Sequence, residues 1–189
     1  MFTKFVENFL MEDECDNIIK LGESIGLEKM LSTKIVDGKI IAQGIEYSEN
    51  KRMGGYFIGE TLENDILKKL TNKVVGISNA IKPFNSIEYT NVPKYSFNRY
   101  SDGDFLDWHE DRHEVLLGAT ITFIIQLNSN YKEGYVRYII DGIEYKVPKI
   151  KGSAFIFDSN ILHSVDKIAS GNRYSLNVWP SSKKKISLI

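Results

Sequence analysis

Short runs of β-branched and aromatic residues follow one another from Glu88 onward, and they constrain the fold more than any other feature. Two of these runs flank Asp141-Gly142, a pair typical of the tight turn of a β-hairpin. Short strands separated by turn residues at such intervals are typical of an all-β sandwich or barrel. We therefore expect residues 88–180 to form a double-stranded β-helix, the cupin-like jelly roll in which two sheets enclose the core.

Helical periodicity appears only in the first half of the chain. Apolar residues that recur every four positions predict a helix over 61–75. A second helix is expected over 13–24, with Cys15, Ile18 and Ile19 on its inward face. We expect these N-terminal helices to pack on one sheet of the jelly roll, which gives an α+β fold.

The remaining signals of the first half are strands, and no linker separates them from the second half. A strand is expected over 2–10, and Asp37-Gly38 between two apolar runs indicates a hairpin. The chain contains no internal repeat or low-complexity segment. We expect residues 1–189 to form a single domain, in which 1–87 support a catalytic core at 88–180.

Charge and cysteine content exclude several classes of protein. The net charge of −1 provides no broad basic field, so there is no strong nucleic-acid signal. Cys15 is the single cysteine, which forbids an intramolecular disulfide and indicates a reducing compartment. No apolar stretch approaches the roughly 20 residues of a membrane span, and the acidic first residues do not resemble a signal peptide. A cytoplasmic location is expected.

Two histidines and one carboxylate are the most informative polar residues. His109 and Asp111 lie two positions apart, so in an extended strand both side chains point to the same face. His163 follows an apolar run and a short polar turn, which would deliver it to the mouth of a barrel. Such a ligand set holds non-haem Fe(II) and leaves coordination positions open for chemistry, so it indicates an iron oxygenase.

Arg173 lies ten residues after His163 and opens an alternating run in which Ser175 shares its face. The permanently charged guanidinium of Arg173 and the hydroxyl of Ser175 would both point inward, where they suit a ligand with a carboxylate group. Two roles remain open for Ser175, because its hydroxyl either binds this ligand or satisfies a backbone group.

A longer stretch around these residues resembles a known family, the 2-oxoglutarate- and Fe(II)-dependent oxygenase superfamily, in its prolyl 4-hydroxylase-like branch. The similarity covers roughly residues 88 to 180, about half of the chain. It is carried by 95–111, which resembles the entry to the catalytic core, by 120–128 and 151–157, and by the pair His163 and Arg173.

The resemblance implies a role for each of these polar residues. In this family a His-x-Asp pair and a distal His hold the iron, which assigns Fe(II) to His109, Asp111 and His163. The basic residue ten positions after the distal His grips the far carboxylate of 2-oxoglutarate, and a Tyr nine positions before the first His hydrogen-bonds the same end. Arg173 and Tyr100 stand at these two positions.

The resemblance also implies a reaction. 2-Oxoglutarate and O2 would be consumed, succinate and CO2 released, and an unactivated C–H bond hydroxylated, with ascorbate as reductant. A peptidyl proline is the favoured substrate, so a peptide or small-molecule partner is expected and a membrane partner is not. Where the family often has paired glycines before the next core strand, this chain has Gly134-Tyr135, which adds bulk near the expected substrate side.

Two other functions remain open at this stage. The same chemistry could act on a free amino acid, another small metabolite or an alkylated nucleobase. Alternatively, the chain could be a non-catalytic cupin-like module that binds a metal or a small acid. The intact ligand set together with Arg173 argues against such a module, because a structural site needs no open coordination positions. The sequence does not indicate an oligomeric state.

Four further features carry weaker expectations. His113 has no partner in the ligand pattern and is expected outside the metal site. Trp108 and Trp179 are expected to pack in the core. The polar segment 48–56 is expected to be either a surface connection or a mobile loop over the active site.

Overall fold

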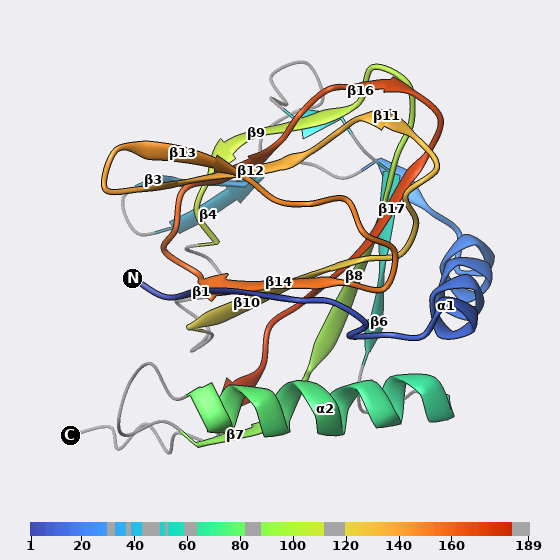
Figure 1. Ribbon diagram of the computed structural model, residues 1–189, viewed down its shortest axis with the longest axis vertical. Helices are drawn as coiled ribbons and strands as arrows, with labels where there is room; N and C mark the ends of the chain where they lie inside the picture. The colour runs from blue at the N-terminus through green and yellow to red at the C-terminus, as the bar shows by residue number, and fades with distance from the viewer. Residues whose placement is uncertain are drawn as a thin grey trace.

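Two antiparallel sheets face each other and form the body of the molecule (Figure 1). The computed structural model describes residues 1–29, 33–36, 39–42, 50–51, 53–58, 64–81, 88–111 and 120–182. The seven-stranded sheet contains, in spatial order, β1 (Thr3–Val6), β14 (Ala154–Asp158), β10 (Ile121–Gln126), β17 (Arg173–Val178), β8 (Lys94–Tyr100), β6 (Met53–Ile58) and β2 (Glu28–Lys29). The five-stranded sheet contains β13 (Ile143–Lys146), β12 (Val136–Ile140), β15 (His163–Val165), β9 (Phe105–His109) and β5 (Asn50–Lys51).

Three two-stranded ladders complete the described sheets, and the whole arrangement confirms the expected jelly roll. They pair β11 (Lys132–Glu133) with β16 (Ile168–Ser170), β7 (Tyr89–Asn91) with β18 (Ser181–Ser182), and β3 (Thr33–Val36) with β4 (Lys39–Ala42). The last pair confirms the predicted N-terminal hairpin, whose turn residues lie outside the described part of the chain. The second predicted hairpin joins β12 to β13, with Asp141 and Gly142 both at positive φ (52° and 77°), as a type I′ turn requires.

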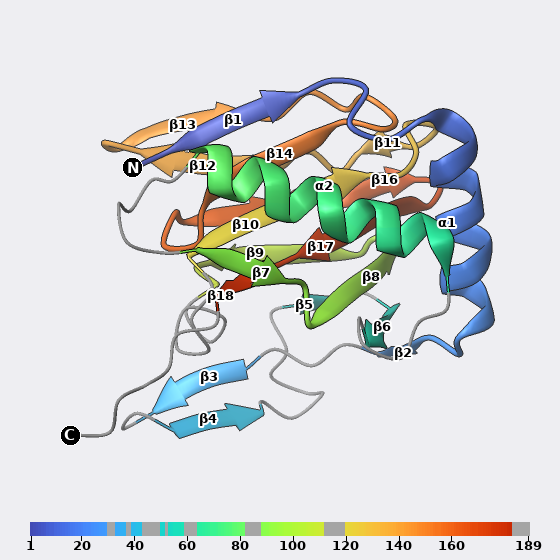
Figure 2. The ribbon, with the colours of Figure 1, turned by 90° about the horizontal axis from the view of Figure 1, so that it is seen from below.

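Two helices flank the seven-stranded sheet. Figure 2 shows α2 (Asp65–Ile81) crossing its outer face and α1 (Glu12–Ser24) at one end of the sandwich. The first helix agrees with the prediction, and its Cys15 and Ile18 are buried. Within the described residues, neither helix is long and apolar enough to cross a membrane.

The second helix lies later in the chain than the predicted 61–75. It begins at Asp65 because the Asn64 side chain accepts hydrogen bonds from the backbone N–H groups of Ile66 and Leu67, at 3.0 and 3.2 Å. It continues to Ile81 because apolar residues extend its inward stripe beyond Val74. The strand β1 is shorter than the predicted 2–10, since Asn8 adopts a positive φ of 52° and leaves the extended conformation.

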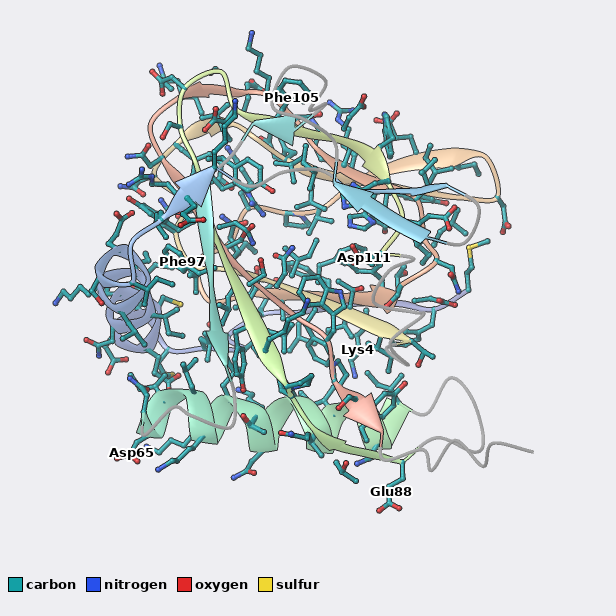
Figure 3. The ribbon with its side chains drawn as sticks, turned by 180° about the vertical axis from the view of Figure 1, so that it is seen from behind. Lys4, Asp65, Glu88, Phe97, Phe105 and Asp111 are labelled. Carbon is teal, nitrogen blue, oxygen red and sulfur yellow. The ribbon has the colours of Figure 1, made fainter. Side chains whose placement is uncertain are left out.

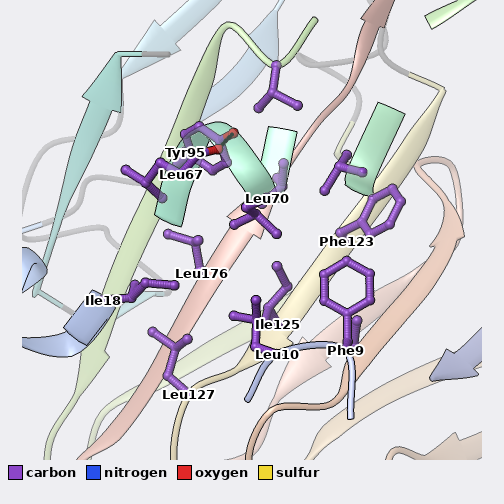
Figure 4. Close-up of a cluster of buried hydrophobic side chains, with 14 of the residues drawn as sticks. Phe9, Leu10, Ile18, Leu67, Leu70, Tyr95, Phe123, Ile125, Leu127 and Leu176 are labelled. Carbon is purple, nitrogen blue, oxygen red and sulfur yellow. Dashed lines mark hydrogen bonds between the residues drawn. The ribbon is translucent and has the colours of Figure 1, made fainter. Parts of the chain in front are cut away.

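Strand alternation gives the seven-stranded sheet two different faces. The outer face packs on the helices, and the inner face looks toward the five-stranded sheet; Lys4 and Phe105 mark the two layers in Figure 3. The outer cluster joins side chains of both helices to β10 and β17, among them Ile18, Leu67, Leu70, Phe123, Ile125 and Leu176 (Figure 4). Positions on the inner face include Thr122, Ile124 and Gln126 of β10, Arg173 and Ser175 of β17, and Tyr100 of β8.

The expectation of a loop at 48–56 is wrong for the residues that the structure describes there. Asn50–Lys51 form β5, which pairs with β9, and Met53–Ile58 form β6, which pairs with β8. These are non-local main-chain pairings, so a polar and Gly-containing composition does not reveal them. The segment therefore belongs to both sheets rather than lying over them.

The two helical glycines at positions 22 and 76 provide a test of this packing. A Cβ atom on Gly22 would overlap the Phe97 ring of β8, whereas one on Gly76 would meet nothing within 4 Å. Gly22→Ala should therefore lower the free energy of unfolding by about 1–3 kcal/mol. Gly76→Ala should raise it by about 1 kcal/mol, since Ala favours an exposed helix. Urea unfolding followed by circular dichroism measures both, and a stabilising Gly22→Ala would contradict the close approach of α1 to β8.

Candidate metal centre and anion pocket

Three possible metal ligands converge at one end of the space between the sheets. His109 ends β9, His163 begins β15, and the two residues stand directly opposite each other in the antiparallel ladder. The Nε2 atoms of His109 and His163 lie 3.8 and 3.9 Å from the carboxylate oxygens of Asp111. One ligand atom from each residue lies within 4.8 Å of the others, which is close enough for a single ion.

Asp111 is positioned differently from the expectation of a shared strand. β9 ends at His109, and the Asp111 backbone N–H donates to the Ser159 carbonyl oxygen at 3.0 Å. The turn that precedes His163 therefore also holds the carboxylate. Figure 3 shows Asp111 between the two layers, on the side away from α1.

Backbone carbonyls orient both imidazoles. The Nδ1 atom of His109 lies 2.8 Å from the Asp107 carbonyl oxygen, and that of His163 lies 2.9 Å from the Ile161 carbonyl oxygen. A carbonyl only accepts, so each Nδ1 carries the proton and each Nε2 keeps its lone pair for a metal. The Phe157 ring packs edge-on against His163 at 4.8 Å and limits its rotation.

The Asp111 carboxylate is buried, and two side-chain donors bond one of its oxygens. Thr122 Oγ1 donates to Oδ2 at 2.7 Å, and Trp179 Nε1 donates to the same oxygen at 3.2 Å. Burial by itself raises the pKa of Asp111, but the positive charge that His163 and His109 carry when protonated, together with the two hydrogen bonds, outweighs it and lowers the pKa below the ordinary value. The group is therefore a carboxylate ready to bind a cation.

Sequence reasoning missed Thr122 and was wrong about one of the two tryptophans. Trp179 is buried as expected, but its indole N–H serves the carboxylate. Trp108 is 36% exposed, so the expectation of core packing is wrong for this residue. A hydroxyl at an inward position of a mainly apolar strand was the available signal for Thr122. His113 falls outside the described residues.

Arg173 forms a second polar centre, on the inner face of the seven-stranded sheet. Its side chain is 1% exposed, and its Nη1 donates to Ser175 Oγ at 3.0 Å. Tyr100 stands opposite Arg173 in the ladder, with the guanidinium carbon 5.1 Å from the centre of its ring. The structure thus brings together the three residues that the sequence indicated for a carboxylate ligand.

The Arg173 guanidinium has unused donors. Its Nε and Nη2 atoms are buried and have no hydrogen-bond partner among the described residues. These two nitrogens lie along one edge of the planar guanidinium, an edge that matches the two oxygens of a carboxylate. Because a buried unpaired donor is costly, the pocket fits an anion, and the His-Asp-His set fits Fe(II).

Tyr131 and Gln126 lie near Arg173 and were not among the expected site residues. Gln126 Nε2 donates to the Tyr131 hydroxyl at 2.8 Å. Outside them, the Tyr135 ring lies 4.1 Å from Lys146 Nζ and 4.5 Å from Lys149 Nζ. Tyr135, which stands where the family often has a glycine, is thus placed among lysines.

An open three-ligand metal site and a buried guanidinium with free donors, on the inside of one jelly roll, define a class of metal-dependent enzymes that use a carboxylate cosubstrate. Residues 95–181 match the family model described as the 2OG-Fe(II) oxygenase superfamily. A comparison with curated proteins finds no significant match.

Solved structures of prolyl hydroxylases share the fold. A Pseudomonas putida prolyl-4-hydroxylase superposes with a TM-score of 0.74 at 16% identity, over 96% of this chain and 93% of that one. A viral collagen prolyl hydroxylase from Paramecium bursaria Chlorella virus-1 gives 0.69 at 18% identity, over 96% and 97%. A Trichoplax adhaerens prolyl hydroxylase in complex with a hypoxia inducible factor peptide fragment gives 0.72 at 17%, over 96% and 84%.

The chain thus matches the 2OG-Fe(II) oxygenase superfamily over residues 95–181, and it shares its fold with the solved prolyl hydroxylases. It is a 2-oxoglutarate- and Fe(II)-dependent dioxygenase. The identities to the solved structures are low, so these structures establish the shared architecture and leave the substrate of this chain to be argued separately.

The hydrogen bond from Thr122 to Asp111 leads to a prediction. Thr122→Val should weaken binding of a divalent ion by about ten- to a hundredfold, because the carboxylate loses a donor that orients it. Thr71→Val is a matched control, since the Thr71 hydroxyl bonds the Leu67 carbonyl within α2. Anaerobic titration with Mn(II) measures both affinities. Equal affinities in the two variants would show that the Thr122 hydroxyl does not prepare the ligand.

Proposed function

We propose that this protein hydroxylates an unactivated C–H bond of a peptidyl proline, with release of succinate and CO2. One observation carries the proposal. Three convergent metal-ligand atoms lie in the same barrel interior as the buried Arg173, whose Nε and Nη2 have no hydrogen-bond partner among the described residues. The choice of proline draws support from the solved neighbours, which are named as prolyl hydroxylases.

In this proposal His109, Asp111 and His163 hold Fe(II) through two Nε2 atoms and a carboxylate oxygen. When bound, the metal supplies activation of O2 coupled to oxidative decarboxylation of 2-oxoglutarate. The chain itself keeps both imidazoles in the protonation state that metal binding requires. The carbonyls of Asp107 and Ile161 hold the proton on Nδ1 of each imidazole, which leaves each Nε2 basic.

Arg173, Tyr100 and Ser175 bind the cosubstrate in the same proposal. The free edge of the Arg173 guanidinium pairs with the C5 carboxylate, and the Tyr100 hydroxyl donates to the same end. Ser175 accepts from Arg173 Nη1, so its own proton remains available for the carboxylate or for a backbone group. Burial of the pocket excludes water and strengthens these interactions.

Apolar rings bound the interior between these polar centres. Phe155 and Phe157 of β14 stack at 4.7 Å, and Tyr138 of β12 packs on Phe155 at 4.7 Å. His109 remains partly open, with 31% of its side chain exposed, so the metal site is accessible from outside. An apolar wall beside an accessible metal suits a compact, weakly polar group such as a pyrrolidine ring.

The proposal includes the working environment of the enzyme. Ascorbate serves as reductant, the protein acts in the cytoplasm, and a peptide or small molecule rather than a nucleic acid is its partner. Residues 1–189 act as a single domain, with 1–87 supporting the catalytic core at 88–180. The same site would also support hydroxylation of a free amino acid, a small metabolite or an alkylated nucleobase, and the substrate assay decides among them.

Succinate release across a substrate panel tests this function. With Fe(II), ascorbate, O2 and 2-oxoglutarate, proline-containing peptides should stimulate succinate formation more than free amino acids or alkylated oligonucleotides. His109→Ala and His163→Ala should abolish both turnover and stoichiometric Fe(II) binding. His113→Ala, which replaces the third histidine of the chain, is the matched control and should keep both. Succinate at the no-enzyme level with every substrate would refute the proposed activity.

Removal of the guanidinium tests the cosubstrate role of Arg173. A hydrogen bond to a charged group contributes about 1.5–3 kcal/mol. At about 1.4 kcal/mol per tenfold, Arg173→Ala should weaken 2-oxoglutarate binding about ten- to a hundredfold or more. Arg173→Lys should bind 2-oxoglutarate with an intermediate affinity, because the lysine ammonium lacks the two parallel N–H donors of the guanidinium. Iron affinity without cosubstrate should stay unchanged in both variants.

Arg99 is the control for this experiment, since its guanidinium pairs on the surface with Glu23 at 2.9 Å. Arg99→Ala should bind 2-oxoglutarate as the wild type does. Isothermal titration of the Mn(II)-loaded protein measures all four affinities. Wild-type affinity in Arg173→Ala would mean that Arg173 is a structural residue and would remove the main support for this cosubstrate site.

A further inference from the structure

The hydrogen bonds that the Gln126 side chain donates limit the direction in which the buried Tyr131 hydroxyl can donate. Gln126 stands opposite Ser175 in the ladder between β10 and β17, so its side chain enters the same interior as Arg173. Its Nε2 donates to the Asn128 carbonyl oxygen at 2.6 Å and to the Tyr131 hydroxyl at 2.8 Å. A carbonyl oxygen only accepts, so the amide must present its NH2 group here. The Tyr131 oxygen therefore accepts a hydrogen bond from Gln126.

The second group beside the Tyr131 hydroxyl is also a donor. Burial raises the pKa of Tyr131, and the charge and hydrogen bonding of Arg173 act against that rise, which places the guanidinium next to the phenol oxygen. Gln126 and Arg173 both donate, so neither accepts the Tyr131 proton. Tyr131 is 7% exposed, and its proton has to point to a third group inside the pocket.

The Tyr131 hydroxyl, which still needs an acceptor, and the unpaired N–H donors of Arg173 lie beside each other. Arg173 offers Nε–H and Nη2–H without a partner among the described residues, and Tyr131 offers O–H beside the same guanidinium. We propose that Tyr131 is a further binding residue of the cosubstrate pocket, whose hydroxyl donates to the distal carboxylate of 2-oxoglutarate and whose ring closes the pocket behind it. This inference rests on the proposed function, because it takes 2-oxoglutarate as the ligand of Arg173.

Tyr131 is held so firmly that it also limits the length of the ligand. Lys149 Nζ donates to the backbone carbonyls of Tyr131 and Glu133, at 3.2 and 2.9 Å, and lies 4.5 Å from the centre of the Tyr131 ring. Gly134 and Gly171, both at positive φ, approach Tyr131 so closely that added Cβ atoms would lie 3.0 and 3.3 Å from it. A ring wedged in this way cannot retreat from a longer dicarboxylate.

Tyr131→Phe tests the hydroxyl, with Tyr135→Phe as the matched control on the same segment. Isothermal titration of Mn(II)-loaded protein with 2-oxoglutarate should show about ten- to a hundredfold weaker binding for Tyr131→Phe. Tyr135→Phe should bind as the wild type does, and Mn(II) affinity should be unchanged in both. Gln126→Leu, which frees the Tyr131 hydroxyl to turn away, should give an intermediate affinity.

Two further measurements separate binding from folding and from catalysis. Metal-free protein titrated with succinate reports the distal carboxylate site alone, and Tyr131→Phe should weaken this binding as well. Tyr131→Ala should narrow the preference for 2-oxoglutarate over 2-oxoadipate, which is one methylene longer.

The outcomes distinguish this inference from the proposed function. Wild-type affinity for 2-oxoglutarate in folded Tyr131→Phe overturns the role of Tyr131 and leaves the cosubstrate assignment intact. If Tyr131→Phe does not fold, wild-type affinity in Gln126→Leu overturns it instead. Failure of the wild-type protein itself to bind 2-oxoglutarate removes the proposed function and this inference together.

Discussion

A fully buried guanidinium is the constraint on which the interior of this protein depends. Arg173 is enclosed between the sheets, where the Ser175 hydroxyl, the Tyr131 hydroxyl and the Tyr100 ring lie beside it. Burial of an uncompensated cation is strongly unfavourable, so this position is tolerable only where an anion arrives to complete it. The described residues of the jelly roll leave this charge incompletely paired, so binding of an anion there would stabilise the folded state.

At the metal end of the interior, by contrast, the buried charge has several partners. Among the described residues, two histidines, a hydroxyl and an indole N–H favour the charged form of Asp111. The two ends thus present opposite charges within the space between the two sheets. A molecule with a metal-binding group at one end and a carboxylate at the other matches both ends at once, as 2-oxoglutarate does in the proposed function.

Local sequence patterns were sufficient for the fold class, the helix α1 and both hairpins, because Asp-Gly turns and amphipathic periodicity act over a few residues. They failed for β5 and β6, whose conformation is set by pairing with β9 and β8. The six expected site residues lie near one another in two groups. Thr122 and Trp179 were missed because their contact with Asp111 depends on the register of strands far apart in the sequence.

The position of the tryptophans has a consequence for spectroscopy. The chain contains two of them, and each is tied to a candidate ligand: Trp108 precedes His109, and Trp179 donates to Asp111. All of the intrinsic indole emission therefore originates beside the metal site. A paramagnetic ion that enters this site lies within quenching range of both fluorophores, one exposed and one buried. The protein thus carries its own optical reporter of metal occupancy, and no label has to be introduced near the centre.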